Sequence, residues 1–152
     1  MLSDYVKAAD PQGKMRLALV DHGTPAPEVN ALRNAVARDL ADLLGRQVLA
    51  CSMERREDSL YDFNEPLLER VDAVPGFSGG RLLAVMFFLL PGRHAGAGGD
   101  VAQICEDLVA RGAYEAIECS PLLGQHPLLV EMLADRYREV RARSLNEISD
   151  LG

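Results

Sequence analysis

The chain has 152 residues, and 16 Lys and Arg against 23 Asp and Glu give it a formal net charge of −7. Its composition, 48% hydrophobic and 26% charged, is typical of a single globular domain that buries a hydrophobic core. The acidic balance excludes the broadly basic surface with which proteins bind nucleic acid or an anionic membrane, so we expect neither as a partner.

The first 14 residues are polar and lack the apolar centre of a signal peptide. The longest apolar run, residues 82–90, has nine residues, about half of what a membrane-crossing helix needs. The three cysteines, Cys51, Cys105 and Cys119, show no CxxC spacing and predict reduced thiols in a cytoplasmic protein. Cys51 and Cys119 fall in predicted strands and are expected to be small core residues.

In the first half of the chain, apolar runs at residues 15–20 and 47–53 predict two strands. Between them apolar residues recur every three or four positions, which predicts an amphipathic helix that ends at Gly45. The inward side chains of this helix are expected to be Val29, Leu32, Val36, Leu40 and Leu43. A second helical stripe at residues 60–74 contains Pro66, which predicts a late start or a kink.

The second half begins with the strongest predicted strand, residues 81–90, which is apolar on both faces as in a parallel sheet buried between helices. A glycine-rich loop at residues 91–100 follows, then a helix that begins at Val101 and ends at Gly112, and a fourth strand at residues 114–119. The last predicted helix starts at Pro127. Its inner face is expected to consist of Leu129, Met132, Leu133, Tyr137 and Val140.

This alternation predicts an α/β fold in which a four-stranded parallel sheet is flanked by helices on both faces. The expected topology is flavodoxin-like, with strand order 2-1-3-4 when the strands are numbered along the chain. We expect a single domain over residues 15–143. An N-terminal extension at residues 1–14 and a frayed C-terminal tail at residues 144–152 complete the chain.

Two of the three histidines follow strands that this topology places side by side. His22 comes directly after the first strand and His94 after the third, and ligands of open parallel sheets bind where the strand order reverses between such neighbours. Imidazole is the commonest metal ligand and a natural proton acceptor near neutral pH. The pair therefore predicts a shared site with an open face, suited to a metal that must arrive and leave.

Several neighbours could complete this site. Glu54 follows the second strand and either reaches across to the histidines or is a solvated charge. Asp21 either orients His22 or is a turn residue, and Asp100 is expected to cap the third helix. His126 is expected to be a structural or rim residue.

The glycines of the loop after the third strand permit two interpretations. Gly98 and Gly99 could cradle an anion at a helix N-terminus or let a bulky ligand approach the backbone. The loop matches neither GxGxxG nor GxxxxGK[ST], so we expect no ATP or other nucleotide.

Three segments in order resemble the CbiX-type sirohydrochlorin chelatases, the class II (ATP-independent) tetrapyrrole chelatases, over residues 16–137. These segments are His22-Gly23-Thr24, then Leu90-Pro91-Gly92-Arg93-His94 with Gly98-Gly99-Asp100, and finally Pro121-Leu122-Leu123-Gly124-Gln125-His126-Pro127-Leu128. The resemblance implies insertion of Co²⁺, or of Fe²⁺ or Ni²⁺ as in relatives, into sirohydrochlorin. It assigns metal binding and catalysis to His22 and His94, and it implies a short single-domain form that pairs as a homodimer.

The sequence departs from the family pattern at three places: Asp21 stands where Gly is usual, Thr24 replaces the common Ser, and a charged stretch follows Met53-Glu54. A non-catalytic metal- or tetrapyrrole-binding paralogue therefore stays open as an alternative. So does a histidine phosphatase, although Asp21 would repel phosphate there, and so does a purely structural role.

Sirohydrochlorin is rich in carboxylates, so an acidic protein that binds it needs a locally basic rim. Arg93, next to His94, is the first candidate for such a rim, and Arg55 and Arg56 are the others. Ordinary solvation of these side chains is the alternative.

Overall fold

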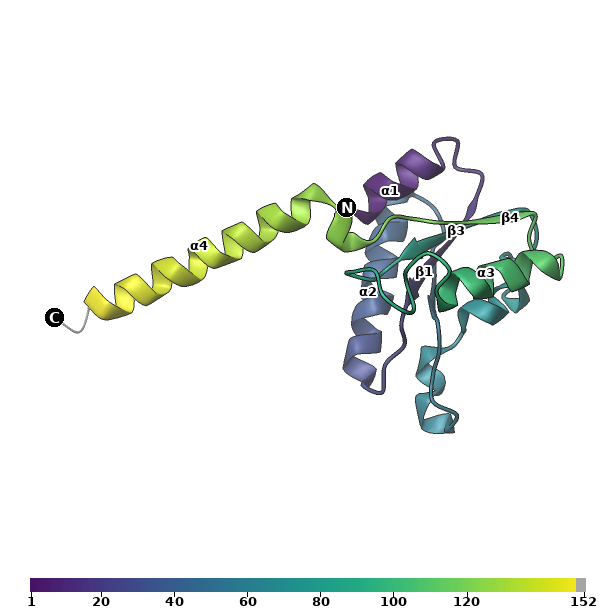
Figure 1. Ribbon diagram of the computed structural model, residues 1–152, viewed down its shortest axis with the longest axis horizontal. Coiled ribbons are helices and arrows are strands. Elements are labelled where there is room, and N and C mark those ends of the chain that lie inside the picture. The colour runs from purple at the N-terminus through teal and green to yellow at the C-terminus, as the bar shows by residue number, and fades with distance from the viewer. Residues whose placement is uncertain (150–152) are drawn as a thin grey trace.

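A computed structural model describes the backbone of residues 1–149 and the side chains of residues 1–143. Its described part contains one parallel sheet with the strand order β2-β1-β3-β4 (Figure 1). The strands are β1 (Arg16–Asp21), β2 (Leu49–Ser52), β3 (Arg81–Met86) and β4 (Ala116–Cys119). The predicted fold class and strand order are therefore confirmed.

The helices lie on both faces of this sheet. The α-helices are α1 (Leu2–Ala9), α2 (Pro27–Leu44), α3 (Asp100–Ala110) and α4 (Pro127–Ser149), and the short 3₁₀ helices are η1 (Ser59–Asn64), η2 (Leu68–Ala73) and η3 (Leu123–Gln125). Gly45 ends α2 in the left-handed conformation at φ 63°, as predicted. No helix among the described residues is both long and apolar enough to cross a bilayer.

Alternate side chains of the central strands feed two hydrophobic clusters. Leu19 and Val85 pack toward α1 and α2, whereas Val20 and Ala84 pack toward η2 and α3. Both faces are thus covered, which explains why β3 is apolar throughout. The segment predicted as an N-terminal extension contributes to this core, because Val6 of α1 is only 1% exposed.

Three local predictions are wrong. In α2, Val29, Leu32 and Leu43 are exposed while Arg33 is buried, because the apolar spacing located the inward face only to within about one residue, or 100°. The stripe at residues 60–74 forms two 3₁₀ helices on either side of Pro66, which cannot donate a helical hydrogen bond. Strand β3 also ends at Met86, four residues early, where the chain turns into the loop that carries His94.

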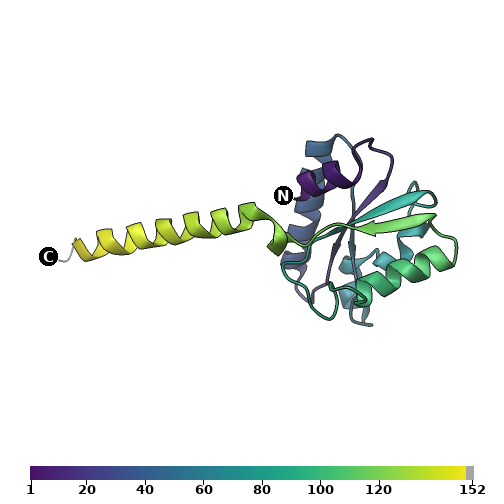
Figure 2. The ribbon, with the colours of Figure 1, turned by 45° about the horizontal axis from the view of Figure 1, so that its top comes forward.

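The last helix also departs from expectation. Figures 1 and 2 show α4 extending away from the rest of the molecule, and its predicted inner face is exposed, with Leu133 at 61% and Tyr137 at 67%. Helix α1 instead packs on β3 and α2 and occupies part of one face of the sheet. Helix α4 continues to Ser149 within the predicted tail at residues 144–152, of which residues 150–152 lie outside the described part.

Candidate functional site

The two histidines singled out by topology lie together at the carboxyl edge of the sheet. The ring centroids of His22 and His94 are 4.6 Å apart, with the ring planes at 75°. The side chains are 47% and 34% exposed, respectively, so both rings remain accessible to solvent. The structure thus brings together two residues separated by most of the domain's sequence and leaves them open on one side.

His94 is oriented by a carboxylate. Its Nδ1 lies 2.5 Å from Oδ2 of Asp100, at the first residue of α3. The prediction that Asp100 caps α3 is wrong, because Gly99 is the N-cap residue and the end has no side-chain cap. A neutral His94 whose Nδ1–H donates to Asp100 presents the lone pair of Nε2 outward, which is the arrangement found around metal-binding histidines.

The glycine-rich loop makes this contact between His94 and Asp100 possible. Gly98 has φ 69°, a left-handed conformation that side chains disfavour. A Cβ atom on Gly99 would lie 2.6 Å from the carbonyl oxygen of Arg93 and 2.9 Å from that of His94. Glycine is therefore required at position 99 because the loop packs tightly against itself where it joins α3. Gly98 is exposed and remains a candidate for contact with a ligand.

His22 lies between a backbone carbonyl and a second carboxylate. Its Nδ1 is 3.2 Å from the carbonyl oxygen of Gly23, and its Nε2 is 3.5 Å from Oε1 of Glu54. If Nδ1–H donates to Gly23, the Nε2 lone pair faces the Glu54 carboxylate, and a proton or a cation between these electron-rich atoms is favourable. A Cβ on Gly23 would lie 2.0 Å from the carbonyl oxygen of Glu54, so glycine is required for this approach.

A buried polar network centred on Asp21 and Arg33 adjoins His22. The Oδ1 atom of Asp21 accepts hydrogen bonds from Ser52 Oγ at 2.7 Å and from the Gly23 N–H at 3.2 Å. Arg33 Nη1 lies 3.5 Å from the same oxygen and 2.5 Å from Ser52 Oγ, and the Arg33 side chain is only 2% exposed. Asp21 therefore stabilises the turn that follows β1. Among the described contacts it makes no hydrogen bond to the His22 ring, so they do not support the interpretation that it orients that ring.

Asn64, at the end of η1, extends this network to the backbone of Thr24, two residues after His22. Its side-chain amide accepts from the Thr24 N–H at 3.0 Å and donates to the Thr24 carbonyl at 2.9 Å. Arg33 also donates to the Asn64 carbonyl at 3.3 Å. The backbone is thus held on both sides of His22. Sequence reasoning missed Arg33, Ser52 and Asn64, and no spacing signal could have found them because they come from three separate elements.

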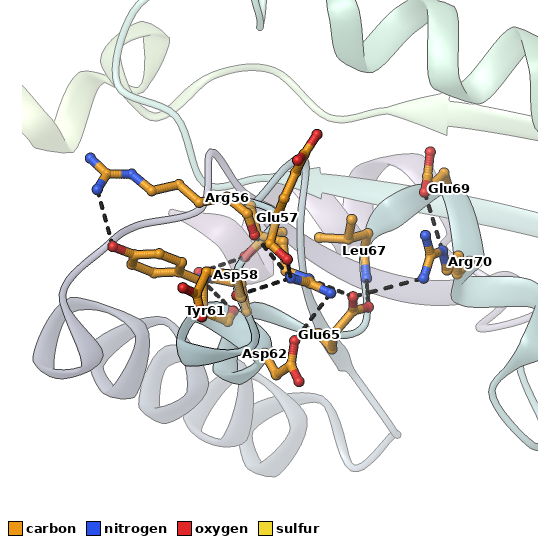
Figure 3. Close-up of polar contacts among 12 residues, drawn as sticks. Arg56, Glu57, Asp58, Tyr61, Asp62, Glu65, Leu67, Glu69 and Arg70 are labelled. Carbon is orange, nitrogen blue, oxygen red and sulfur yellow. Dashed lines mark hydrogen bonds and ion pairs between the residues drawn. The ribbon is translucent and has the colours of Figure 1, made fainter.

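The three arginines proposed for a basic rim differ in their surroundings. Arg55 pairs with Glu65 at 2.8 Å and with Asp62 at 3.1 Å, so its charge is already compensated; both carboxylates are labelled in Figure 3. Arg56 lies over the Tyr61 ring, 5.2 Å from its centroid. Arg93 is exposed and immediately precedes His94 in the loop, so it alone of the three adjoins a site histidine in the chain.

His126 is a structural residue of the α1–α4 junction. Its ring packs edge-on against Tyr5 at 5.2 Å, and its Nε2 lies 3.4 Å from Asp4. Within the described side chains, no three His, Cys, Asp or Glu residues are grouped so that they could enclose a metal. The candidate site therefore consists of the histidine pair with one carboxylate beside each ring.

The fold and this pair define an α/β domain with an imidazole site at its topological switch point. The CbiX family model matches residues 16–140, and the chain therefore belongs to the CbiX family. This membership implies a metal chelatase role in tetrapyrrole biosynthesis, and it favours a chelatase over a histidine phosphatase.

A solved structure supports the fold. The crystal structure of a Marinobacter aquaeolei VT8 protein, named for cobalamin (vitamin B12) biosynthesis and CbiX, is similar with a TM-score of 0.59 and 22% identity. The similarity covers 85% of this chain and 98% of that one. No curated protein matches the chain by sequence.

Proposed function

We propose that this protein inserts a divalent metal, Co²⁺ in preference to Fe²⁺ or Ni²⁺, into sirohydrochlorin without ATP. His22 and His94 bind the metal and accept the protons that leave the ring. The observation that carries the proposal is the open histidine pair, with ring centroids 4.6 Å apart at the switch point of the sheet. The CbiX membership supports the reaction class, and the cobalamin name of the structurally similar protein supports Co²⁺ as the first metal to test.

The reaction requires the metal to lose water, the ring to expose its nitrogens, and two N–H protons to leave. His94 with Nδ1 bound to Asp100 offers Nε2 to the metal. His22 offers Nε2 beside Glu54, whose negative charge favours either a bound cation or a proton on the ring. Each histidine that releases metal to the tetrapyrrole becomes free to take a proton, so metal transfer and proton removal use the same atoms.

The loop that carries His94 supplies candidates for contact with the tetrapyrrole. Leu89 and Leu90 are 53% and 66% exposed, and such apolar side chains suit the face of a flat macrocycle. Arg93 would pair with a substrate carboxylate, and Glu54 and Gly98 would contact the ring edge. Gly99 would contact the substrate only through its backbone. The absence of a side chain at this position is already explained by the close packing of the loop.

The test is anaerobic metal insertion followed by absorbance. With Co²⁺, sirohydrochlorin and no nucleotide, the protein is expected to raise the insertion rate well above the spontaneous rate, and Fe²⁺ and Ni²⁺ serve as competing metals in parallel. A rate equal to the spontaneous one would overturn the proposal. Tight binding of metal or tetrapyrrole in that case would instead support the non-catalytic paralogue.

Asp100 is expected to act on metal binding through His94. We expect Asp100→Ala to weaken Co²⁺ binding by about 10- to 100-fold, because the His94 ring loses the acceptor that fixes its orientation and basicity. Isothermal titration with Co²⁺ measures the effect. Asp107→Ala is the matched control, since Asp107 lies in the same helix and contacts Gln103 rather than a histidine. Equal affinities for wild type and Asp100→Ala would contradict this role.

A further inference from the structure

Helix α4 carries an apolar stripe whose described side chains are largely exposed to solvent. Leu133, Tyr137 and Val140 are 61%, 67% and 62% exposed, and the helix projects away from the body in both views (Figures 1 and 2). Long helices in water gain most of their stability from packing an apolar face. A contiguous exposed stripe of this kind marks an interaction surface.

The chain's own body does not receive this stripe. Helix α1 holds the start of α4 through the His126 ring on Tyr5 at 5.2 Å, and Tyr5 Oη donates to the Leu122 carbonyl at 3.2 Å. Val6 of the same helix is buried against the central strands and α2, so α1 already occupies that part of the sheet. These contacts direct α4 outward.

A groove of about 520 Å³ lies between α3 and the edge strand β4. Its apolar lining includes Cys105, Val109 and Ile117, and Glu106 and Glu115 belong to the same groove. Figures 1 and 2 show α3 and α4 extending on opposite sides of the molecule, so α4 of the same chain does not lie in this groove. The groove is therefore open to another molecule.

The stripe and the groove are complementary in charge. Arg141 and Arg143 follow Leu133 by eight and ten residues, which places them about 80° to either side of it on the helix. An apolar stripe flanked by arginines thus matches an apolar groove that carries two glutamates. Because both surfaces belong to the same chain, a second copy would supply each surface with its counterpart.

We propose that α4 of one copy docks in the α3–β4 groove of a second copy, and that reciprocal exchange of the two helices forms a homodimer. Helix-in-groove docking and exchange of an identical element between protomers are both established ways of burying an amphipathic helix. This proposal does not rest on the proposed function. It assigns a surface to the homodimer that the family resemblance predicts.

Light scattering after size exclusion, over a range of concentrations, tests the proposal. Wild type is expected to be dimeric and Leu133→Glu monomeric. Because Leu133 is exposed, the variant is expected to fold as wild type does, which circular dichroism checks. Ala142→Glu is the matched control, because nine residues place Ala142 about 180° from Leu133 on the same helix. A monomeric wild type, or a dimeric Leu133→Glu, would overturn the proposal.

The groove side is tested separately. Val109→Glu is expected to abolish the dimer as Leu133→Glu does, because Val109 is 37% exposed in the groove. A dimeric Val109→Glu alongside a monomeric Leu133→Glu would show that α4 docks elsewhere and would overturn the assignment of the groove.

Alkylation of Cys119 gives an independent measure of groove occupancy. Cys119 was predicted as a core residue, but its side chain is exposed in the groove. A hydrogen bond from Cys105 lowers the pKa of Cys119, which favours the reactive thiolate, whereas burial raises the pKa of Cys51 to about 12. Cys119 is expected to react at least about tenfold more slowly in wild type than in Leu133→Glu. Equal rates in the two proteins would contradict the proposed docking.

Discussion

Replacing either His22 or His94 by alanine is expected to reduce protein-dependent Co²⁺ insertion into sirohydrochlorin by at least about 100-fold. Each ring is proposed to hold the metal and to accept a proton, and the two rings form one site because their centroids are 4.6 Å apart. The double variant is therefore expected to lose little more activity than either single variant, since residues that act as a unit are not additive. Initial insertion rates under anaerobic conditions measure these effects.

His126→Ala is the matched control for both variants. It removes the third imidazole, which packs on Tyr5 at the α1–α4 junction, and the insertion rate per folded molecule is expected to stay at the wild-type value. Circular dichroism establishes that all three variants are folded. Full activity in either His22→Ala or His94→Ala would contradict the proposed mechanism, even if wild type is active.

Replacing Arg33 by methionine is expected to lower the free energy of unfolding by about 3–5 kcal/mol. Methionine fills much of the same space but leaves the buried Asp21 carboxylate without its cation, and Asp21 is only 8% exposed as a residue. It also removes the donors to Ser52 and to the Asn64 carbonyl. Urea denaturation followed by circular dichroism measures the loss.

Arg38→Met is the control for Arg33→Met, because Arg38 lies on the same helix but is exposed. Its expected effect is within about 0.5 kcal/mol. Adding Asp21→Asn to Arg33→Met is expected to recover part of the lost stability, since the unpaired buried charge is then removed. A loss below about 1 kcal/mol for Arg33→Met would show that the network contributes little to the fold.

The loop around His94 shows how far local pattern reasoning reaches. The sequence alone predicted that His94 follows a strand, because apolar strand segments and glycine-rich loops are recognisable from local sequence pattern. The role of Asp100 was not, since an Asp at a helix start ordinarily caps the helix. The left-handed Gly98 and the tight packing of Gly99 bring Asp100 to His94 instead, and such loop geometry has no signature in spacing.

What the sequence determined by itself was the α/β class, the strand order and the meeting of His22 with His94. Strand order 2-1-3-4 leaves one switch point, and both histidines follow the strands that form it. Tertiary structure alone decided which residues support that pair, because Asp21, Arg33 and Asn64 converge from elements distant in the chain. It also decided the position of α4. Periodicity reveals an apolar face, but what covers that face depends on how the other elements, α1 among them, fill the space around the sheet.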